Sequence, residues 1–374
     1  MKVLITGGAG FISKWLVEKL PQNTEIILVD SLDGQVHKNL SEFAPELQRR
    51  AVCIKADIRE THTYQDAIEG TDVVIHLAAQ TGTGQSMYEI SKYVQQNVDG
   101  TAKLLELLSR LKQKPRRIIL SSSRAVYGEG AFVNGAEIYY TQGRRLHELQ
   151  QGIWEVCNDE GNLLSSLPMR EIQLVNPTSI YGFTKLWQEQ LVKNFCEYQN
   201  IDSIIFRLQN VYGPKQELDN PYTGIIGIFT NSIIQRNQVE LFEDGLMSRD
   251  FVFVEDVAQA IIKAIFIEQP ISSIINIGSG KATTLKTLVE TIAYLTKKQP
   301  TVKVSGRFRV GDIRHAVADM SLYRSQLGKW SPTSLKRGLE EYLNWYLEQV
   351  PPTDTNLQVS LREMEKKGLL QMSK

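Results

Sequence analysis

Tyr181 and Lys185 stand four residues apart where the apolar spacing begins to predict a helix, over residues 182–199. Side chains four apart on a helix project from one face, so the ammonium would lie close to the phenol. A neighbouring positive charge stabilises a phenolate and lowers the tyrosine pKa toward values useful for a base. This pair therefore predicts a proton shuttle at Tyr181.

The same spacing occurs twice elsewhere in the chain, as Tyr88 with Lys92 and as Tyr294 with Lys298. Only Tyr181 follows a predicted strand that ends in serines and precedes a further buried strand. We therefore expect Tyr88 and Tyr294 to be packing residues on helices.

Three consecutive serines, Ser121, Ser122 and Ser123, end a predicted buried strand that begins at residue 117. Open α/β sheets bind their ligands at this carboxyl edge. A hydroxyl there can share a hydrogen bond with a substrate oxygen while a nearby phenolate moves the proton. For Ser121 and Ser122, simple capping of the turn is the preferred interpretation.

A glycine-rich loop, residues 7–10, separates a predicted first strand from a predicted first helix. Such a loop lets backbone N–H groups approach a pyrophosphate at the helix N-terminus, although it also occurs as a plain turn. Asp30 ends the second strand, where a carboxylate accepts hydrogen bonds from a ribose 2′-hydroxyl and repels a 2′-phosphate. The two features together predict NAD in preference to NADP. Ser13 replaces the third glycine of the pattern and is expected to hold the first helix slightly farther from the sheet.

Short β-branched runs alternate with helical patterns over the first two hundred residues. Almost wholly apolar strands are typical of a parallel sheet covered on both faces, which makes the predicted fold class α/β. The predicted strands are 3–6, 25–30, 51–56, 73–77, 117–121 and 203–208, and the predicted helices are 11–20, 91–111, 182–199, 257–267 and 285–296.

Two stretches interrupt this alternation. Residues 129–177 are too long for an ordinary connection, and we interpret them as an insertion. The insertion joins the strand end at Ser123 to the helix of Tyr181, so it forms either a lid over the pocket or a surface elaboration. The C-terminal extension, residues 351–374, forms either a short amphipathic helix or a disordered end.

Further motifs follow in a fixed order along residues 1–348, and together they resemble the extended short-chain dehydrogenase/reductase family. Within it, the chain is most similar to the NAD-dependent nucleotide-sugar epimerases and dehydratases, especially the 4-epimerases. The motifs are TGGAGFI at 6–12, Asp30, Ala56-Asp57-Ile58, HLAAQ at 76–80, SSSRAVYG at 121–128, Tyr181-xxx-Lys185, Asn210-Val-Tyr-Gly-Pro214, SRDFVFVEDV at 248–257 and Arg309-Val-Gly-Asp312.

The resemblance implies a Rossmann-type, doubly wound parallel sheet with a smaller C-terminal substrate-binding lobe. Residues 1–128 and 178–210 would bind NAD, with a return segment at about 250–280. Residues 211–249 and 281–350 would bind the nucleotide sugar.

The resemblance also implies roles for individual residues. Ser123 would hold the sugar oxygen, with Tyr181 as base and Lys185 as its assistant; Asp57 would contact the adenine, and Asn97 would position the helix or the cofactor pocket. The implied NAD-binding residues are Gly7, Gly10, Phe11, Ile12, Asp30, Asp57, Ile58, Leu77, Ala78, Ala79, Gln80, Asn97, Tyr181 and Lys185.

The resemblance implies three residues for the substrate, Asn210, Arg249 and Arg309 at the diphosphate, and Arg124, unusual for the family, is a fourth candidate at the sugar. Arginine suits phosphate because its planar fork binds two oxygens at once. The alternative for the arginines is surface salt bridging, for instance of Arg249 with Asp250 or Glu255. Arg124, beside the catalytic serine, is in a position to read a second anion such as a uronate carboxylate.

The residues after Ser123 separate the reactions of the family. Dehydratases carry an acidic residue there, whereas this chain has Arg124 and Ala125. The remaining chemistry needs only a hydride and one proton, which predicts C4 epimerisation of a nucleotide-diphosphate sugar through a transient 4-keto intermediate. A 4-keto-sugar reductase, a 4,6-dehydratase and a non-catalytic NAD-binding protein are the alternatives.

The insertion also resembles that of rhamnose-type 4-epimerases acting on deoxythymidine-diphosphate sugars, in which it carries paired cysteines. Only Cys157 is present here, and the other two cysteines, Cys53 and Cys196, are far apart in the sequence, so we expect no metal site and no disulfide framework.

Composition and charge restrict the partners and the location. The 42 basic side chains equal the 42 acidic ones, which argues against nucleic acid and anionic membranes as partners. No apolar run approaches the roughly 18 residues of a membrane span, and residues 1–6 do not resemble a signal peptide. We expect a cytoplasmic protein.

We also expect a homodimer. The predicted helices 91–111 and 182–199 correspond to those that pair in the resembled family. Leu104, Leu105, Leu107 and Leu108 would supply apolar surface for that contact.

Overall fold

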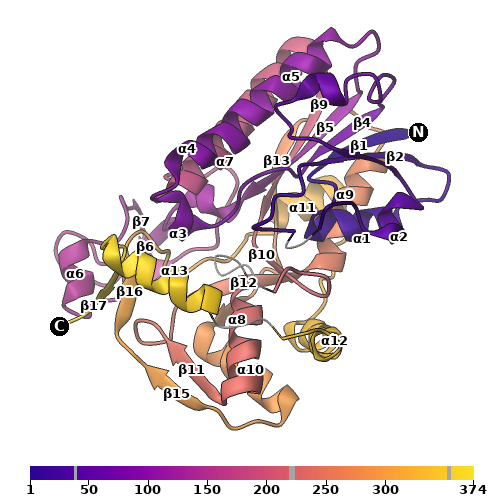
Figure 1. The fold of residues 1–374 in the computed structure, drawn as a ribbon. Helices are drawn as coiled ribbons and strands as arrows, with labels where there is room; N and C mark the ends of the chain where they lie inside the picture. Colours follow the sequence, from indigo (N-terminus) through magenta and orange to yellow (C-terminus); the bar gives the residue numbers. More distant parts are fainter. Residues whose placement is uncertain (38–39, 219–223, 352–354) are drawn as a thin grey trace.

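The computed structural model describes residues 1–37, 40–218, 224–351 and 355–374. Its centre is a seven-stranded sheet in which every neighbouring pair is parallel (Figure 1). The strand order is β13 (Ser273–Ile277), β9 (Asp202–Leu208), β5 (Arg117–Ser123), β4 (Val73–His76), β1 (Lys2–Thr6), β2 (Glu25–Asp30) and β3 (Val52–Lys55). This is the Rossmann-type α/β sheet that the alternation of runs predicted, with six strands near their expected places and β13 added at one edge.

Helices cover both faces of the sheet. One face holds α1 (Phe11–Lys19), α9 (Val254–Phe266) and α11 (Ser321–Leu327). The other holds α7 (Ile180–Gln199) and a long helix that runs from α4 (Ile90–Tyr93) through the π-helical segment η2 (Val94–Asp99) into α5 (Gly100–Arg110). Burial from both sides explains why the strands are almost wholly apolar.

The leucines expected at a dimer contact belong instead to the protein's own core. Leu104, Leu105, Leu107 and Leu108 are at most 6% exposed and pack with Val192 of α7 on the sheet. The spacing of these leucines marks the inward face of α5, so the expectation that they supply a dimer surface is wrong.

A smaller lobe lies beyond the carboxyl edge of the sheet, in the lower half of Figure 1. It has its own apolar core, built on a three-stranded sheet and a two-stranded sheet. Its elements are β10 (Asn210–Tyr212), β12 (Ser248–Phe253), β14 (Ala282–Thr284), β11 (Gln238–Leu241), β15 (Thr301–Val304), α8 (Ile225–Asn231), η4 (Ser232–Arg236), α10 (Leu285–Thr296) and α12 (Leu335–Leu347). Residues 219–223 of this predicted lobe lie outside the described residues.

The predicted insertion folds into its own small unit. Its elements are β6 (Ala131–Asn134), β7 (Glu137–Tyr140), β8 (Ser165–Ser166) and α6 (Leu146–Gln150). Ion pairs tie it to the lobe: Arg144 contacts Glu243 at 2.8 Å, and Glu155 contacts Arg314 at 2.6 Å. Arg144 also pairs with Glu129 inside the insertion at 3.0 Å, and Arg314 with Glu243 inside the lobe at 2.9 Å. The insertion is therefore anchored at several points between its two ends.

The part of the C-terminal extension that the structure describes is folded. Helix α13 (Thr355–Lys366) leads into β17 (Leu370–Met372), which pairs antiparallel with β16 (Arg307–Arg309) of the lobe. Met364 and Leu370 pack with Tyr88, which follows β4 of the main sheet, and with Phe242 of the lobe. The amphipathic-helix alternative is the correct one for these residues; residues 352–354 lie outside the described part.

Short elements complete the chain at the carboxyl edge of the main sheet and around it. They are α2 (Pro45–Gln48), η1 (Thr61–Thr63), α3 (Thr83–Ser86) and η3 (Arg124–Tyr127).

Candidate active site

Ser123, Tyr181 and Lys185 come together where β5 ends against the first turns of α7. The Ser123 hydroxyl shares a hydrogen bond with Tyr181 and also accepts one from the backbone N–H of Ala125 at 3.1 Å. Lys185 Nζ donates to the Ser121 carbonyl oxygen at 2.8 Å. The N-terminus of α7 is capped by the Ser179 hydroxyl, which accepts from the Gly182 N–H and fixes where the helix begins.

The other two serines bond within the protein. Ser121 Oγ donates to the His76 carbonyl oxygen at 3.3 Å, and Ser122 Oγ donates to Glu189. These contacts agree with the interpretation that Ser121 and Ser122 stabilise the end of the strand.

The electrostatics of the tyrosine differ from the expectation. Burial raises the pKa of Tyr181 above its ordinary value, while the hydrogen bond with Ser123 and the charge of Arg124 oppose this rise. Burial lowers the pKa of Lys185 to about 7, opposed by the charge of Glu189. In the protein without cofactor, Arg124 is the cation that opposes the rise of the Tyr181 pKa, and the role of Lys185 toward the phenol stays a prediction.

The two decoy pairs have other surroundings. Tyr88 lies between α3 and α4, donates to Glu363 of α13, and is not on one helix with Lys92. Tyr294 is 72% exposed, and α10 ends before Lys298. The spacing alone does not distinguish these tyrosines from Tyr181; the element that carries them does.

The glycine loop packs tightly against the neighbouring strand end. Gly7 adopts a φ of +71°, and a Cβ there would lie 2.8 Å from the backbone nitrogen of Ala78. The Asp30 carboxylate accepts from the Ala9 N–H at 3.0 Å and from the Leu32 N–H at 2.8 Å. These bonds and the nearby His37 hold the pKa of Asp30 below its ordinary value although burial acts to raise it. An ionised carboxylate thus stands beside the loop.

Phe11 and Ile12 begin α1 directly after the loop, and Ser13 is fully buried behind them. The Ser13 hydroxyl finds no hydrogen-bond partner among the described residues. The serine therefore fits in place of glycine at the cost of an unsatisfied buried hydroxyl.

The segment after β4 is fixed by a buried amide. Asn97 Oδ1 accepts from the Gln80 N–H at 2.7 Å, and Asn97 Nδ2 donates to the Gln80 carbonyl oxygen and to Thr184 of the catalytic helix. Leu77, Ala78 and Ala79 lie between β4 and this anchor, and the Leu77 N–H bonds the Thr6 carbonyl oxygen. Gln80 Oε1 is buried and has no partner among the described residues.

Asp57 lies beyond β3 with Ile58 packed against Gly100. Arg59 donates to both carboxylate oxygens of Asp57, and Gln96 donates to one of them. These donors, Arg59 first, lower the pKa of Asp57 to about 2. The carboxylate is ionised and partly accessible at the end of the crevice.

The substrate residues from four separate segments meet beside Tyr181. Arg124 Nε donates to Asn210 Oδ1 at 2.9 Å, and Arg249 Nη2 donates to Asp312 Oδ1 at 3.0 Å. Although burial acts to raise it, Arg249 and Arg309 hold the pKa of Asp312 below its ordinary value. Arg309 Nε is buried without a partner among the described residues. Four guanidinium groups, of Arg249, Arg309, Arg144 and Arg124, act on this carboxylate, and within the described part of the chain only that of Arg144 is paired with further carboxylates, Glu129 and Glu243. The remaining positive excess suits an anionic ligand.

The alternative for Arg249, a surface salt bridge with Asp250 or Glu255, does not form. Asp250 is buried and accepts from Ser279, Gly280 and Ala318, while Glu255 pairs with Lys19. Sequence proximity suggested Asp250 or Glu255, but β12 turns Arg249 toward Asp312.

A family model described as the NAD dependent epimerase/dehydratase family matches residues 3–144 and 162–278. The chain belongs to this family. The gap in the match, residues 145–161, falls inside the predicted insertion, so this epimerase/dehydratase family member departs from the common pattern where its extra unit is inserted.

Relatives within the family are nucleotide-sugar enzymes. The chain is 37% identical over 356 residues to dTDP-L-rhamnose 4-epimerase of Burkholderia thailandensis, covering 93% of this chain and 96% of the relative. Among solved structures it is similar to UDP-N-acetylglucosamine 4-epimerase of Methanobrevibacter ruminantium in complex with UDP-N-acetylmuramic acid, with a TM-score of 0.75, 27% identity and coverage of 93% and 99%. It is also similar to UDP-glucuronic acid 4-epimerase of Bacillus cereus in complex with UDP-glucuronic acid and NAD, with a TM-score of 0.76, 25% identity and coverage of 93% and 99%.

The cofactor of this epimerase/dehydratase family member is NAD, and groups suited to it stand at the loop after β1 and the segment after β4. A Cβ at Gly7 would clash with the backbone of Ala78, so the tight turn needs glycine there. The N–H groups of residues 7–10 bond within the protein, which leaves those at the start of α1 to face a pyrophosphate. Asp30 offers an ionised carboxylate for ribose hydroxyls, and the unpartnered Gln80 Oε1 offers a buried acceptor.

Sequence reasoning missed several residues of the site. Asp312 was named only as the end of a motif, although a carboxylate three residues after Arg309 could have indicated that it lies beside the arginines. His76, also inside a quoted motif, is buried between the hydroxyls of Thr6 and Thr101 behind the catalytic lysine. Ser86 accepts from the Tyr181 N–H at 3.0 Å, a contact that no motif indicated.

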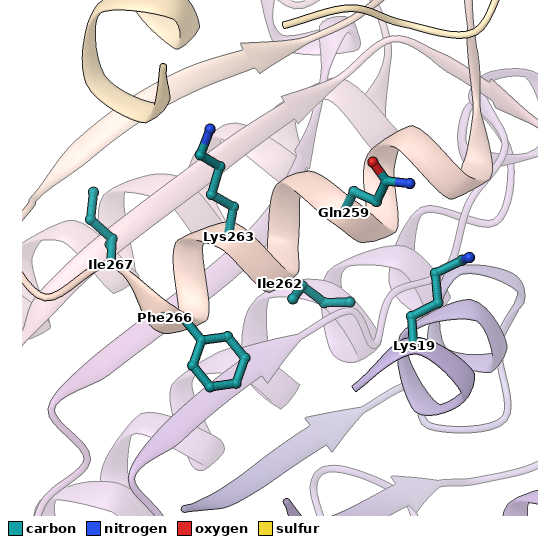
Figure 2. Close-up of a pocket in the computed structure, with 6 residues that line it drawn as sticks. All are labelled: Lys19, Gln259, Ile262, Lys263, Phe266 and Ile267. Atoms are coloured by element: carbon teal, nitrogen blue, oxygen red, sulfur yellow. The ribbon is translucent and has the colours of Figure 1, made fainter. Parts of the chain in front are cut away.

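The rest of the described chain offers no competing site. Within it, no group of His, Cys, Asp and Glu side chains is suited to a metal ion, and no helix has both the length and the apolar character to cross a bilayer. Figure 2 shows a shallow hollow over α9, lined by Lys19, Gln259, Ile262, Lys263, Phe266 and Ile267. Ile267 bonds Arg117 at the amino end of β5, so this hollow extends toward the sheet edge opposite to the catalytic residues.

Proposed function

We propose that the enzyme inverts the C4 hydroxyl of a nucleotide-diphosphate sugar by oxidising it to a 4-keto sugar and reducing it again on the other face. The observation that carries this proposal is the grouping of Ser123, Tyr181 and Lys185 beside the charge of Arg124 and the arginines around Asp312. The three relatives described above are 4-epimerases of nucleotide sugars, which supports the same reaction class, although dehydratases also occur among the relatives.

The protein's own groups have separate tasks in this reaction. Tyr181, as phenolate, takes the proton of the C4 hydroxyl while Ser123 holds the same oxygen. Bound NAD supplies the acceptor, and later the donor, of the hydride at C4. Tyr181 then returns its proton to the carbonyl oxygen as the C4–H bond re-forms, so that protons and electrons balance over one turnover. Lys185 orients the cofactor ribose beside the phenol.

The arginines hold the part of the substrate that does not react. Arg249, Arg309 and Asn210 bind the diphosphate, which leaves the 4-keto sugar free to turn between the two hydride transfers. Arg124 lies one residue beyond Ser123 and contacts the sugar. The unpartnered Arg309 Nε supports an anionic ligand at this position.

The surrounding carboxylates argue against 4,6-dehydration. That reaction needs an acid beside the sugar, but Arg124 and Ala125 occupy the expected places. Glu129 pairs with Arg144, and Asp312 pairs with Arg249, so both nearby carboxylates are already committed. A one-way reductase is disfavoured by Asp30, because such enzymes commonly use NADPH.

The experiment that tests the proposal begins with mass spectrometry of the nucleotide that copurifies with the enzyme. The protein is then incubated with UDP-, dTDP-, GDP- and CDP-sugars, and C4 inversion is followed by NMR. Inversion without net consumption of NAD is expected. Loss of water from the sugar would show a dehydratase, and net oxidation of the cofactor would show a reductase. A protein inactive on all the sugars would favour the non-catalytic NAD-binding alternative.

We further propose that the enzyme is a cytoplasmic homodimer paired through α7 and the α4–α5 helix. With the leucines of α5 buried, the contact surface is the outer stripe of α7, where Phe183, Trp187 and Tyr198 are exposed and Leu191 and Phe195 half-buried. Their spacing of three or four residues gathers them on one face. The three cysteines are free thiols, in keeping with a reducing compartment.

We propose that the insertion covers the sugar pocket. Arg144 Nη2 donates to the Asp312 carbonyl oxygen at 2.8 Å, which places the insertion against the residue that orients Arg249. If deletion of the insertion leaves a folded enzyme with unchanged turnover and sugar affinity, it is a surface elaboration instead.

A further inference from the structure

Two loops of the nucleotide-binding half grip each other through a reciprocal pair of amides. Gln35 Nε2 donates to Gln85 Oε1 at 2.7 Å, and Gln85 Nε2 donates back to Gln35 Oε1 at 3.0 Å. A second bridge joins the same loops, where Gln80 Nε2 donates to Asp33 Oδ2 at 3.1 Å. Both contacts join residues that lie about fifty positions apart in the chain.

The sheet order determines what these contacts cover. Gln35 belongs to the loop that leaves β2, and Gln85 belongs to α3 in the segment that leaves β4. These two strands flank β1 on either side, and the glycine loop follows β1 at the same edge. Neighbouring strands are roughly 4.8 Å apart, so loops from β2 and β4 meet only by spanning the end of β1. The amide pair therefore spans the crevice in front of residues 7–10.

The pair is held in place from the α3–α4 side. Gln85 is buried; its Oε1 also accepts from the Tyr93 hydroxyl at 3.1 Å, and its Nε2 also donates to Glu89 at 3.1 Å. Lys92 Nζ donates to Gln35 Oε1 at 2.9 Å. Gln35 is thus the half-buried partner on the loop side, docked onto a rigid Gln85.

The same element contacts the catalytic helix and the C-terminal extension. Ser86, next to Gln85, accepts from the Tyr181 N–H, while Met364 of α13 packs on Gly84. α13 crosses between α3 and the lobe (Figure 1). The α3 side of the contact is therefore fixed from behind, and the loop that carries Gln35 is the part that moves if the crevice opens.

We propose that Gln35 and Gln85 form a latch that closes the cofactor crevice and retains NAD through the whole turnover. This inference rests on the proposed function, since an epimerase must keep its reduced cofactor while the 4-keto sugar turns, whereas a reductase must release the oxidised cofactor and bind a reduced one in every turnover. The latch slows the dissociation of NAD, and this effect adds to that of the contacts that bind NAD directly.

The test measures cofactor exchange without any sugar. Holoenzyme is mixed with excess isotopically labelled NAD, and the bound label is counted over time. Gln35→Ala and Gln85→Ala should each speed exchange about tenfold, the size expected for two lost hydrogen bonds. The double variant should be no faster than the faster single variant, because each substitution removes the same reciprocal pair.

Gln259→Ala, which removes an exposed amide on α9, is the matched control and should exchange like the wild type (Figure 2). The melting temperature of each NAD-free variant shows whether the substitution lowers the stability of the whole protein. Gln35 is half-buried, so Gln35→Ala still tests the latch if Gln85→Ala fails to fold. Unchanged exchange in Gln35→Ala, or additive effects in the double variant, would overturn the latch.

Because exchange is measured without sugar, the two proposals fail separately. An active epimerase whose exchange ignores Gln35 refutes the latch alone. A protein without epimerase activity whose exchange responds to Gln35 and Gln85 refutes the proposed reaction alone.

Discussion

Lys185 Nζ donates a hydrogen bond to the backbone carbonyl oxygen of Ser121, 2.8 Å away. This bond ties the second turn of α7 to the end of β5, although the two residues are 64 positions apart in the chain. Ser123, two residues further along β5, is thereby brought within hydrogen-bond reach of Tyr181, one turn earlier on α7. The catalytic group is thus assembled by a strand end and a helix start that are fixed to each other.

Tyr181→Phe removes only the phenolic oxygen, so folding and NAD binding should survive. Turnover, measured as C4 inversion, should fall on the order of 10²–10⁴-fold, because proton transfer has lost its base. Ser123→Ala should cost less. Tyr294→Phe, at an exposed tyrosine with the same lysine spacing, should match the wild type, and so should Tyr88→Phe; an active Tyr181→Phe enzyme would contradict the mechanism.

Lys185→Met should weaken NAD binding and slow turnover together, because one ammonium serves both the ribose and the phenol. We expect about tenfold weaker NAD binding by calorimetry, the size of a lost charge-assisted hydrogen bond. Lys193→Met changes an exposed lysine on the same helix and serves as the control. Normal NAD affinity in Lys185→Met would remove the lysine from the cofactor site.

Arg309→Met and Arg124→Met should differ in which ligand they lose. Arg309→Met should weaken both the free nucleoside diphosphate and the nucleotide sugar about ten to one hundredfold, because a guanidinium contact to phosphate is lost. Arg124→Met should weaken only the nucleotide sugar, and most strongly one that carries a uronate carboxylate. Calorimetry distinguishes the cases, with Arg337→Met, an exposed arginine on α12, as the control.

His76 should make the protein sensitive to acid. Burial, with a smaller contribution from the charge of Lys185, lowers the pKa of His76 to about 3, against an ordinary value of 6.5. Between these values the unfolded chain binds a proton that the folded chain does not, so the free energy of unfolding falls as the pH falls. At a pH of about 5 this loss is about 2 kcal/mol.

Urea unfolding near pH 7.5 and near pH 5, with NAD saturating, measures this difference. His76→Gln should lose about 2 kcal/mol less than the wild type between the two pH values, whatever its stability at the higher one. Equal losses in both proteins would show that His76 is not the group that titrates.

Trp187→Glu should separate the proposed dimer. Trp187 is 56% exposed on the apolar stripe of α7, and a carboxylate there would be buried without a partner on assembly. Light scattering should give twice the chain mass of 42.4 kDa for the wild type and a single chain mass for the variant. Tyr294→Glu changes an exposed aromatic residue elsewhere and should stay dimeric; a monomeric wild type would contradict the assembly.

The sequence by itself determined the features that depend on neighbouring residues. The glycine loop after a β-branched run, the apolar strands and the helical spacing of Tyr181 and Lys185 each follow from local geometry. They therefore predicted a parallel sheet and six of its seven strands. The motif order then indicated the family, and with it the positions of Ser123, Asp30 and the arginines.

Only the tertiary structure decided which faces and partners these residues have. The leucines of α5 turned inward, Arg249 paired with Asp312 instead of its neighbours, and the C-terminal extension docked on β16 and α3. Gln35 met Gln85 across the end of β1. Each of these contacts joins residues tens to hundreds of positions apart, and the free energy that selects among such pairings comes from packing and desolvation of the whole fold, which no local pattern contains.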